Sequence, residues 1–148
     1  MLKAGMSRYD ITPPQGLELA GYPHYPRNNT GFHDPLFAAC MYLNNGEKEF
    51  AWVTLDLLFF SKVHVAAARK LAAEKCGIDP KAIMISCSHT HSGPWAAGRL
   101  DIESLEAGKE QPKEYVEFLV ETIAEAISDA KNNSFSALFT AGTTVCGS

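Results

Sequence analysis

Residues 36–88 carry the pattern that most constrains the fold, because three apolar runs and one helical stretch follow one another in a fixed order. The runs LFAACMYL and EFAWVTLDLLFF flank NNGEK, whose Asn-Gly pair is typical of a tight turn between antiparallel strands. Ser61 then precedes KVHVAAARKLAAEKC as a helix cap, and Gly77 ends that helix. AIMISCS follows as a short buried strand. A strand, a helix and a strand within about 40 residues predict a right-handed crossover between parallel strands.

Two later segments complete the expected architecture. PKEYVEFLVETIAEAISDAKNN has apolar residues on one helical face, so we expect it to pack on the sheet. FSALFTAGTTV, residues 135–145, is expected to form another strand. The sequence therefore predicts an α/β fold: a mixed sheet with an antiparallel hairpin and a right-handed β-α-β crossover, with helices packed on it.

Two stretches lack any periodicity. Residues 11–35 and 93–112 are interrupted by prolines and glycines, which exclude a long helix or a central strand. Loops of this length are unusual in a compact domain and often carry a binding site. We therefore expect both to be active-site loops.

Charge and composition exclude several classes of function. A net charge of -4 gives no basic surface for phosphates, so nucleic acid is not an expected partner. No apolar run approaches the length of about 18 residues that a membrane span requires, and the first residues do not resemble a signal peptide. The four cysteines, Cys40, Cys76, Cys87 and Cys146, form no CxxC pair and are expected to be free thiols. Free thiols slightly favour the cytoplasm over secretion.

The stretch SCSHTHSGPW, residues 86–95, contains the strongest functional signal. Side chains two residues apart on a strand share a side, so His89 and His91 are expected to point the same way. They follow the end of a parallel strand, where open α/β sheets place their ligands. Asp56 ends the preceding strand among apolar neighbours, where a carboxylate is costly unless it is paired or bound to metal. A metal or catalytic site is favoured here over a network of loop hydrogen bonds.

The spacing alone leaves the complete ligand set open. A catalytic zinc ion usually has three protein ligands and one open position. His89 and His91 can supply two, and His33 and Asp56 are the nearest further candidates. Serine catalysis by Ser88 or Ser92 is a weaker alternative, because neither lies in a GxSxG motif.

Four motifs occur in an order that resembles a known family. DITPP with AGY, then GFHDPLFA, then the strand ending at Asp56, and above all HTHSGP resemble the N-terminal part of the neutral/alkaline non-lysosomal ceramidases. The resemblance implies a zinc-dependent amidase that releases a sphingoid base and a fatty acid from ceramide. It also implies that His89 is a zinc ligand and that His91 lies beside the metal as a catalytic residue. His33 and Asp56 fall at matching positions and are candidate supporting or substrate-binding residues. We also expect Asp56 to orient the His89 ring, as carboxylates often do for metal-ligating histidines.

The resemblance also bears on domain organisation. The family's catalytic domain continues past the matched region, and its remaining zinc ligands come from that later part. We therefore expect residues 1–148 to form a single domain, the N-terminal fragment of a larger catalytic domain that is inactive alone. Two alternatives stay open: a metal-free binding or assembly module on the same scaffold, and a hydrolase of the same family that acts on other amides or esters. The sequence does not give the oligomeric state.

Overall fold

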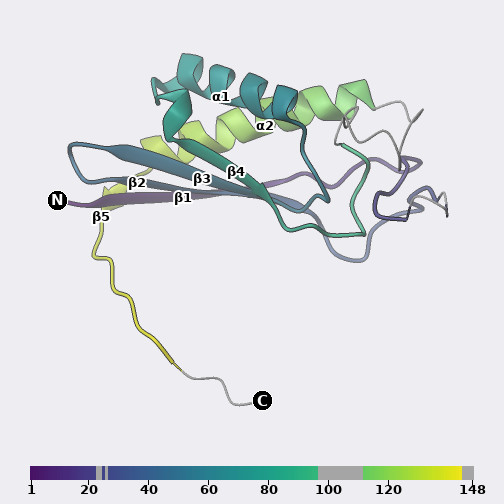
Figure 1. Cartoon of the computed structure of the whole chain (residues 1–148), viewed down its shortest axis with the longest axis horizontal. Helices are drawn as coiled ribbons and strands as arrows, with labels where there is room; N and C mark the ends of the chain where they lie inside the picture. Colours follow the sequence, from purple (N-terminus) through teal and green to yellow (C-terminus); the bar gives the residue numbers. More distant parts are fainter. Residues whose placement is uncertain (23–24, 26, 97–111, 145–148) are drawn as a thin grey trace.

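The computed structural model describes residues 1–22, 25, 27–96 and 112–144. Its centre is a five-stranded sheet in the order β4-β3-β2-β1-β5. Both long helices cover one face of this sheet, as Figure 1 shows. The strands are β1 (Lys3–Asp10), β2 (Phe37–Asn44), β3 (Glu49–Leu55), β4 (Ile83–Cys87) and β5 (Phe135–Ser136), and the helices are α1 (Lys62–Cys76), η1 (Pro80–Ala82) and α2 (Lys113–Asn132).

The hairpin and the crossover predicted from the sequence are confirmed. β2 and β3 pair antiparallel across the Asn-Gly turn, and β3 and β4 pair in parallel across α1. The Ser61 hydroxyl accepts a hydrogen bond from the backbone N–H of His64 and so caps α1. Gly77 ends α1 in the left-handed conformation, with φ of 70°, which glycine adopts without steric cost. The helix cap, the helix stop and the Asn-Gly turn thus mark this part of the mixed sheet in the sequence itself.

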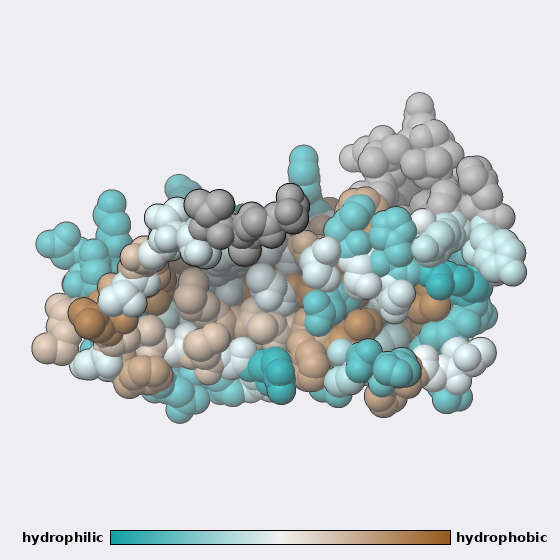
Figure 2. All heavy atoms as spheres, turned by 90° about the horizontal axis from the view of Figure 1, so that it is seen from below, coloured by the Kyte–Doolittle hydropathy of each residue, from teal (hydrophilic) through white to brown (hydrophobic). Residues whose placement is uncertain are grey.

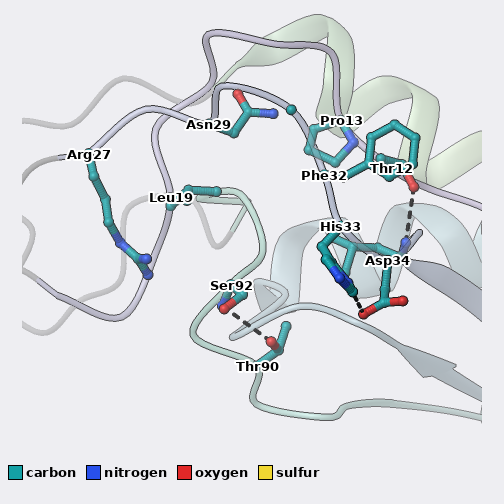
Figure 3. Close-up of a pocket in the computed structure, with 12 residues that line it drawn as sticks. Thr12, Pro13, Leu19, Arg27, Asn29, Phe32, His33, Asp34, Thr90 and Ser92 are labelled. Atoms are coloured by element: carbon teal, nitrogen blue, oxygen red, sulfur yellow. Dashed lines mark hydrogen bonds and ion pairs between the residues drawn. The ribbon is translucent and has the colours of Figure 1, made fainter.

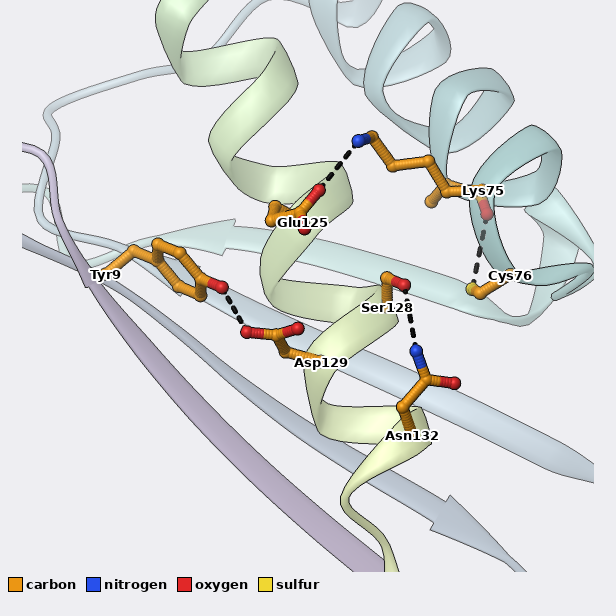
Figure 4. Close-up of polar contacts among 8 residues, drawn as sticks. Tyr9, Lys75, Cys76, Glu125, Ser128, Asp129 and Asn132 are labelled. Atoms are coloured by element: carbon orange, nitrogen blue, oxygen red, sulfur yellow. Dashed lines mark hydrogen bonds and ion pairs between the residues drawn. The ribbon is translucent and has the colours of Figure 1, made fainter.

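β1 is the strand that the sequence prediction missed, because KAGMSRYD has no β-branched residue and little alternation of polarity. Its pairing with β2 over its full length places it inside the sheet. Ser7 donates a hydrogen bond to the carbonyl of Ala126 in α2 at 2.7 Å. The Tyr9 hydroxyl donates a hydrogen bond to Asp129, as Figure 4 shows. Close packing at Gly5 and the polar contacts of Ser7 and Tyr9 therefore hold β1 against α2.

The predicted helix α2 lies against β1 and β2 and carries much of the core. Its buried positions recur at helical spacing and include Leu119, Ile123 and Ile127, all fully buried. Lys75 of α1 and Glu125 of α2 form an ion pair at 2.7 Å across the outer surface (Figure 4). The core thus lies between one face of the sheet and the two helices.

The strand expected at residues 135–145 was largely wrong, since β5 comprises only Phe135 and Ser136 within the described residues. The antiparallel register pairs Ser136 with Lys3, and the Ala137 N–H donates to the Leu2 carbonyl. Among the described residues, no strand pairs with residues 138–144, which lie beyond the point where β5 meets the start of β1. Residue 145 lies outside the described residues.

Two sequence expectations concern membranes and thiols. Within the described ranges, no helix combines the length and the apolar character that crossing a bilayer requires. Cys40, Cys76 and Cys87 are free thiols, as expected, and Cys146 lies outside the described residues.

Candidate functional site

The parallel pairing of β3 and β4 continues past both strands and leads directly into the histidine motif. The Ser88 N–H donates to the Leu55 carbonyl at 2.9 Å, and the His89 N–H donates to the Leu57 carbonyl at 3.0 Å. The backbone at His89 is thereby held to the loop after β3. The motif lies at the carboxyl edge of the parallel strands, as the sequence predicted.

His89 has an unusual backbone conformation and a fixed ring. Its φ of 61° is the one left-handed value at a non-glycine position among the described residues. Its Nδ1 atom lies 3.2 Å from the Leu58 carbonyl, and the Phe59 ring meets it edge-on at a centroid distance of 5.0 Å. A proton donated from Nδ1 to that carbonyl leaves the lone pair on Nε2, which is the arrangement of many metal-ligating histidines.

His91 lies beside His89, which confirms that the two rings share a side. Their centroids are 5.3 Å apart, and the rings are inclined at 77°. The Tyr22 ring meets His91 edge-on at 5.6 Å, and the Arg27 guanidinium lies 4.4 Å from the centre of the Tyr22 ring. Arg27 also donates a hydrogen bond to the His91 carbonyl. The loop of residues 11–35 therefore supports the histidine motif from the side.

Gly21 leaves space for the His91 ring. A Cβ atom at Gly21 would lie 2.6 Å from His91 Cγ and Nδ1, and Gly21 has a φ of 97°. No larger residue fits there without moving the imidazole. The sequence prediction did not assign this role to Gly21, Tyr22 or Arg27, although AGY stood among the family motifs. Their contacts with His91 span about 70 residues, and no local pattern signals them.

Asp56 joins the ends of β2 and β3. Its carboxylate accepts a hydrogen bond from the Phe37 N–H at 3.0 Å, and its own N–H donates to the Phe37 carbonyl at 2.9 Å. The expected partner of the His89 ring was Asp56, but the structure places the Leu58 carbonyl there. Asp56 therefore shapes the sheet edge beneath the motif and does not orient the ring itself.

His33 lines a cavity whose lining includes neither His89 nor His91. His33 is exposed and pairs with Asp34 at 2.9 Å between Nδ1 and Oδ2. Both line this cavity of about 520 Å³ together with Thr90 and Ser92, the residues that alternate with the two histidines (Figure 3). In the described part of the chain, no hydrogen bond or ring contact joins His33 to His89 or His91.

Other described residues in and around the histidine motif show no arrangement that would make them catalytic. Trp95, which follows the histidine motif, is buried with Ala20 and Leu58. Burial raises the pKa of the Cys87 thiol to about 11, so this thiol at the end of β4 stays protonated and is a poor nucleophile near neutral pH. Within the described ranges, no hydrogen bond joins Ser88 or Ser92 to a histidine ring, which gives no support to serine catalysis.

The donor set present is compatible with part of a metal site. His89 has an oriented imidazole at the sheet edge, and His91 adds a second imidazole beside it. No cluster of three histidine, cysteine or acidic side chains suited to a metal ion occurs among the residues that the structure describes. These residues can thus supply one or two nitrogen ligands of a tetrahedral site.

Comparisons with known proteins identify the family and the fold. The family model for the N-terminal region of neutral/alkaline non-lysosomal ceramidases matches residues 2–146. Neutral ceramidase from Pseudomonas aeruginosa superposes with a TM-score of 0.76 at 22% identity, covering 90% of this chain and 22% of that one. A ceramidase in complex with C2 gives a TM-score of 0.73 at 23% identity, with coverage of 90% and 21%. No curated protein sequence matches the chain.

Proposed function

The chain belongs to the neutral/alkaline non-lysosomal ceramidase family, and on this premise we propose that it forms the N-terminal part of a zinc-dependent amide hydrolase. The substrate class is a lipid N-acyl amide such as ceramide, cleaved to an amine and a fatty acid. The family match over residues 2–146 supports the reaction class. The observation that carries the proposal is the paired, oriented imidazoles of His89 and His91 at the carboxyl edge of the sheet.

His89 is the residue that would hold zinc. The Leu58 carbonyl fixes its ring through Nδ1 and presents Nε2 away from the backbone. When bound, a zinc ion supplies an acidified water molecule and polarises the acyl carbonyl of the substrate. The protein's own contribution at this position is to fix the direction of one ligand before metal or substrate arrives.

His91 is the residue we assign to proton transfer. Its exposed ring stands beside His89, and Tyr22, Gly21 and Arg27 determine where it lies. A ring nitrogen at this distance from a ligand can donate a hydrogen bond to the carbonyl oxygen or pass a proton to the leaving amine. Asp56 supports the site through the ends of β2 and β3. For His33, which lines the separate cavity, we keep the proposal that it contacts a more distant part of the substrate.

The chain spans about one fifth of the length of the two solved ceramidases that it resembles. We therefore assign the remaining zinc ligands and the amidase activity to the complete catalytic domain. Residues 1–148 alone are proposed to be inactive, since two imidazoles do not complete a catalytic zinc site.

An activity assay on the product of the complete gene tests the proposal. Fatty-acid release from ceramide and from simple N-acyl amides is measured for the wild type, for His91→Gln, and for His64→Gln as a control in α1. The wild type and the control are expected to hydrolyse an amide, and His91→Gln is expected to lose most of kcat. Hydrolysis of simple amides alone would reassign the substrate. A folded wild type without any hydrolysis would contradict the proposal and favour a binding module.

A further inference from the structure

The face of the sheet opposite α1 and α2 is largely apolar and has no covering layer among the described residues. We call it the open sheet face. In β1, Gly5, Ser7 and Tyr9 point toward α2, so the alternation of a strand sends Ala4 and Met6 to the other side. Figure 2 views the molecule from that side and shows hydrophobic side chains gathered over the strands.

The strand register aligns these side chains in continuous rows. Met6 lies opposite Met41, Met41 opposite Trp52, and Trp52 opposite Met84, so one apolar row crosses four strands. A second row crosses β5, β1, β2 and β3 and consists of Phe135, Ala4, Leu43 and Phe50. The side chains that protrude most are Met6 at 75% exposure and Phe135 at 64%.

A sheet face exposed to water usually carries polar side chains, and these two rows do not. A sheet with one solvated face alternates apolar and polar residues along each strand, whereas strands that are apolar on both sides are buried on both. The next row toward the carboxyl edge holds polar residues of this face, Arg8, Thr54 and Ser86. Trp52 Nε1 donates to Ser86 Oγ at 2.9 Å, and the Arg8 guanidinium lies 4.3 Å from the centre of the Phe37 ring. Since the Trp52 N–H already has a partner, an apolar layer over the two apolar rows leaves no side-chain donor of those rows unpaired.

We infer that the open sheet face is covered by a second layer built from polypeptide of the same protein outside residues 1–148. The match is to the N-terminal region of the family, and the chain covers only 22% and 21% of the two solved ceramidases. After β5 the chain descends on the side of the sheet away from the helices (Figure 1). It carries Leu138 and Phe139 there at 89% and 73% exposure, which continues the apolar surface in that direction. A second apolar layer is the usual way for such a face to be buried.

Hydroxyl-radical footprinting of the complete gene product tests this inference without reference to zinc or activity. Reactivities of Met6 and Met84 in the native protein are divided by their reactivities in the denatured protein. Phe118, on α2, is the control, because its exposure of 44% matches the 42% of Met84. Met6 and Met84 are expected to be protected several-fold more than Phe118, and equally so at all protein concentrations.

The other results would overturn the inference. Protection of Met6 and Met84 that disappears on dilution would identify a second copy of the protein as the cover. Reactivity of both methionines at or above that of Phe118 would mean that the face is solvated.

A pair of substitutions gives an independent measurement. Met6→Gln is compared with Val63→Gln, a site of 74% exposure on α1. The Met6 variant is expected to lower the thermal midpoint clearly more, because it buries an amide in an apolar layer. Equal midpoints for the two variants would contradict a covering layer.

Discussion

At the scale of single residues, the site depends on two backbone positions with left-handed dihedral angles. His89 has a φ of 61° and Gly21 has a φ of 97°, and together they fix the neighbouring imidazoles. A non-glycine residue in this region of φ costs roughly 1–2 kcal/mol, so the surrounding contacts must hold His89 there. The hydrogen bonds of its N–H and its Nδ1 are such contacts.

Gly21→Ala is predicted to displace His91. Gly16→Ala is the matched control, since Gly16 has a φ of 94° but a Cβ there meets nothing within 4 Å. Both variants lose about 1 kcal/mol from the backbone conformation, and Gly21→Ala loses a further 1–3 kcal/mol, roughly, from the clash with the ring. Denaturant unfolding of both variants measures the difference. Equal loss in the two variants would show that the Gly21 contact does not constrain His91.

Only some of the contacts around the two histidines could be predicted from the sequence. The rings of His89 and His91 lie side by side as predicted, but not through strand alternation, because β4 ends before His89, whose φ of 61° is left-handed. The support from Tyr22 and Arg27 was not predictable, because it joins loops 64 or more residues apart that have no periodicity. The contact of His89 with the Leu58 carbonyl was also unpredictable, because every residue has a backbone carbonyl and the residue type gives no signal.

At the scale of elements, predictability followed the strength of local signals. Ser61, Gly77 and the Asn-Gly turn mark ends of elements through their own chemistry, and the structure places elements accordingly. β1 carries no such signal and forms because β2 and α2 pair and pack with it. The length of β5 was overestimated because apolar composition indicates a strand only where a partner strand continues.

Gly5→Ala is predicted to separate α2 from β1. A Cβ atom at Gly5 would lie 1.7 Å from the carbonyl oxygen of Ala130, which is backbone and cannot rotate away. We expect a loss of about 3 kcal/mol or more, since the helix itself must shift. Gly142→Ala, where a Cβ meets nothing within 4 Å, is the control. Thermal midpoints of the two variants check this, and an unchanged midpoint for Gly5→Ala would contradict the close packing.

The ion pair between Glu49 of β3 and Lys131 of α2 is predicted to make stability depend on acid. Their charged atoms are 2.8 Å apart. Burial acts to raise the pKa of Glu49, but hydrogen bonds from Lys131 and Tyr42 outweigh it and hold the pKa below its ordinary value of 4.5. A lowered pKa in the folded state gives stability that is present above 4.5 and is lost as the pH falls through the lower, folded value.

Glu49→Gln should therefore lower stability by about 1 kcal/mol at neutral pH and flatten its decline in acid. Unfolding free energies of the wild type and the variant, measured between neutral pH and about pH 3, test this. Parallel curves for the two proteins would mean that Glu49 contributes no proton-linked stability.

At the scale of the whole molecule, the sheet has two different roles. Its helix-covered face holds the core, and its carboxyl edge positions the imidazoles. The open sheet face and the incomplete ligand set among the described residues both fit our proposal that residues 1–148 are part of a larger domain. Neither feature could be predicted from the sequence by periodicity, because both depend on which surface the helices leave uncovered and on what else converges on it.

The central claim is that His89 holds a zinc ion, and metal analysis of the complete gene product tests it most directly. Zinc content and affinity are measured for the wild type, for His89→Ala and for His64→Ala, whose imidazole bonds to Ser61 at 2.9 Å in α1. We predict stoichiometric zinc in the wild type and in the His64 variant, with a steep loss of affinity in His89→Ala. Full zinc in a folded His89→Ala variant, or none in the folded wild type, would contradict the account.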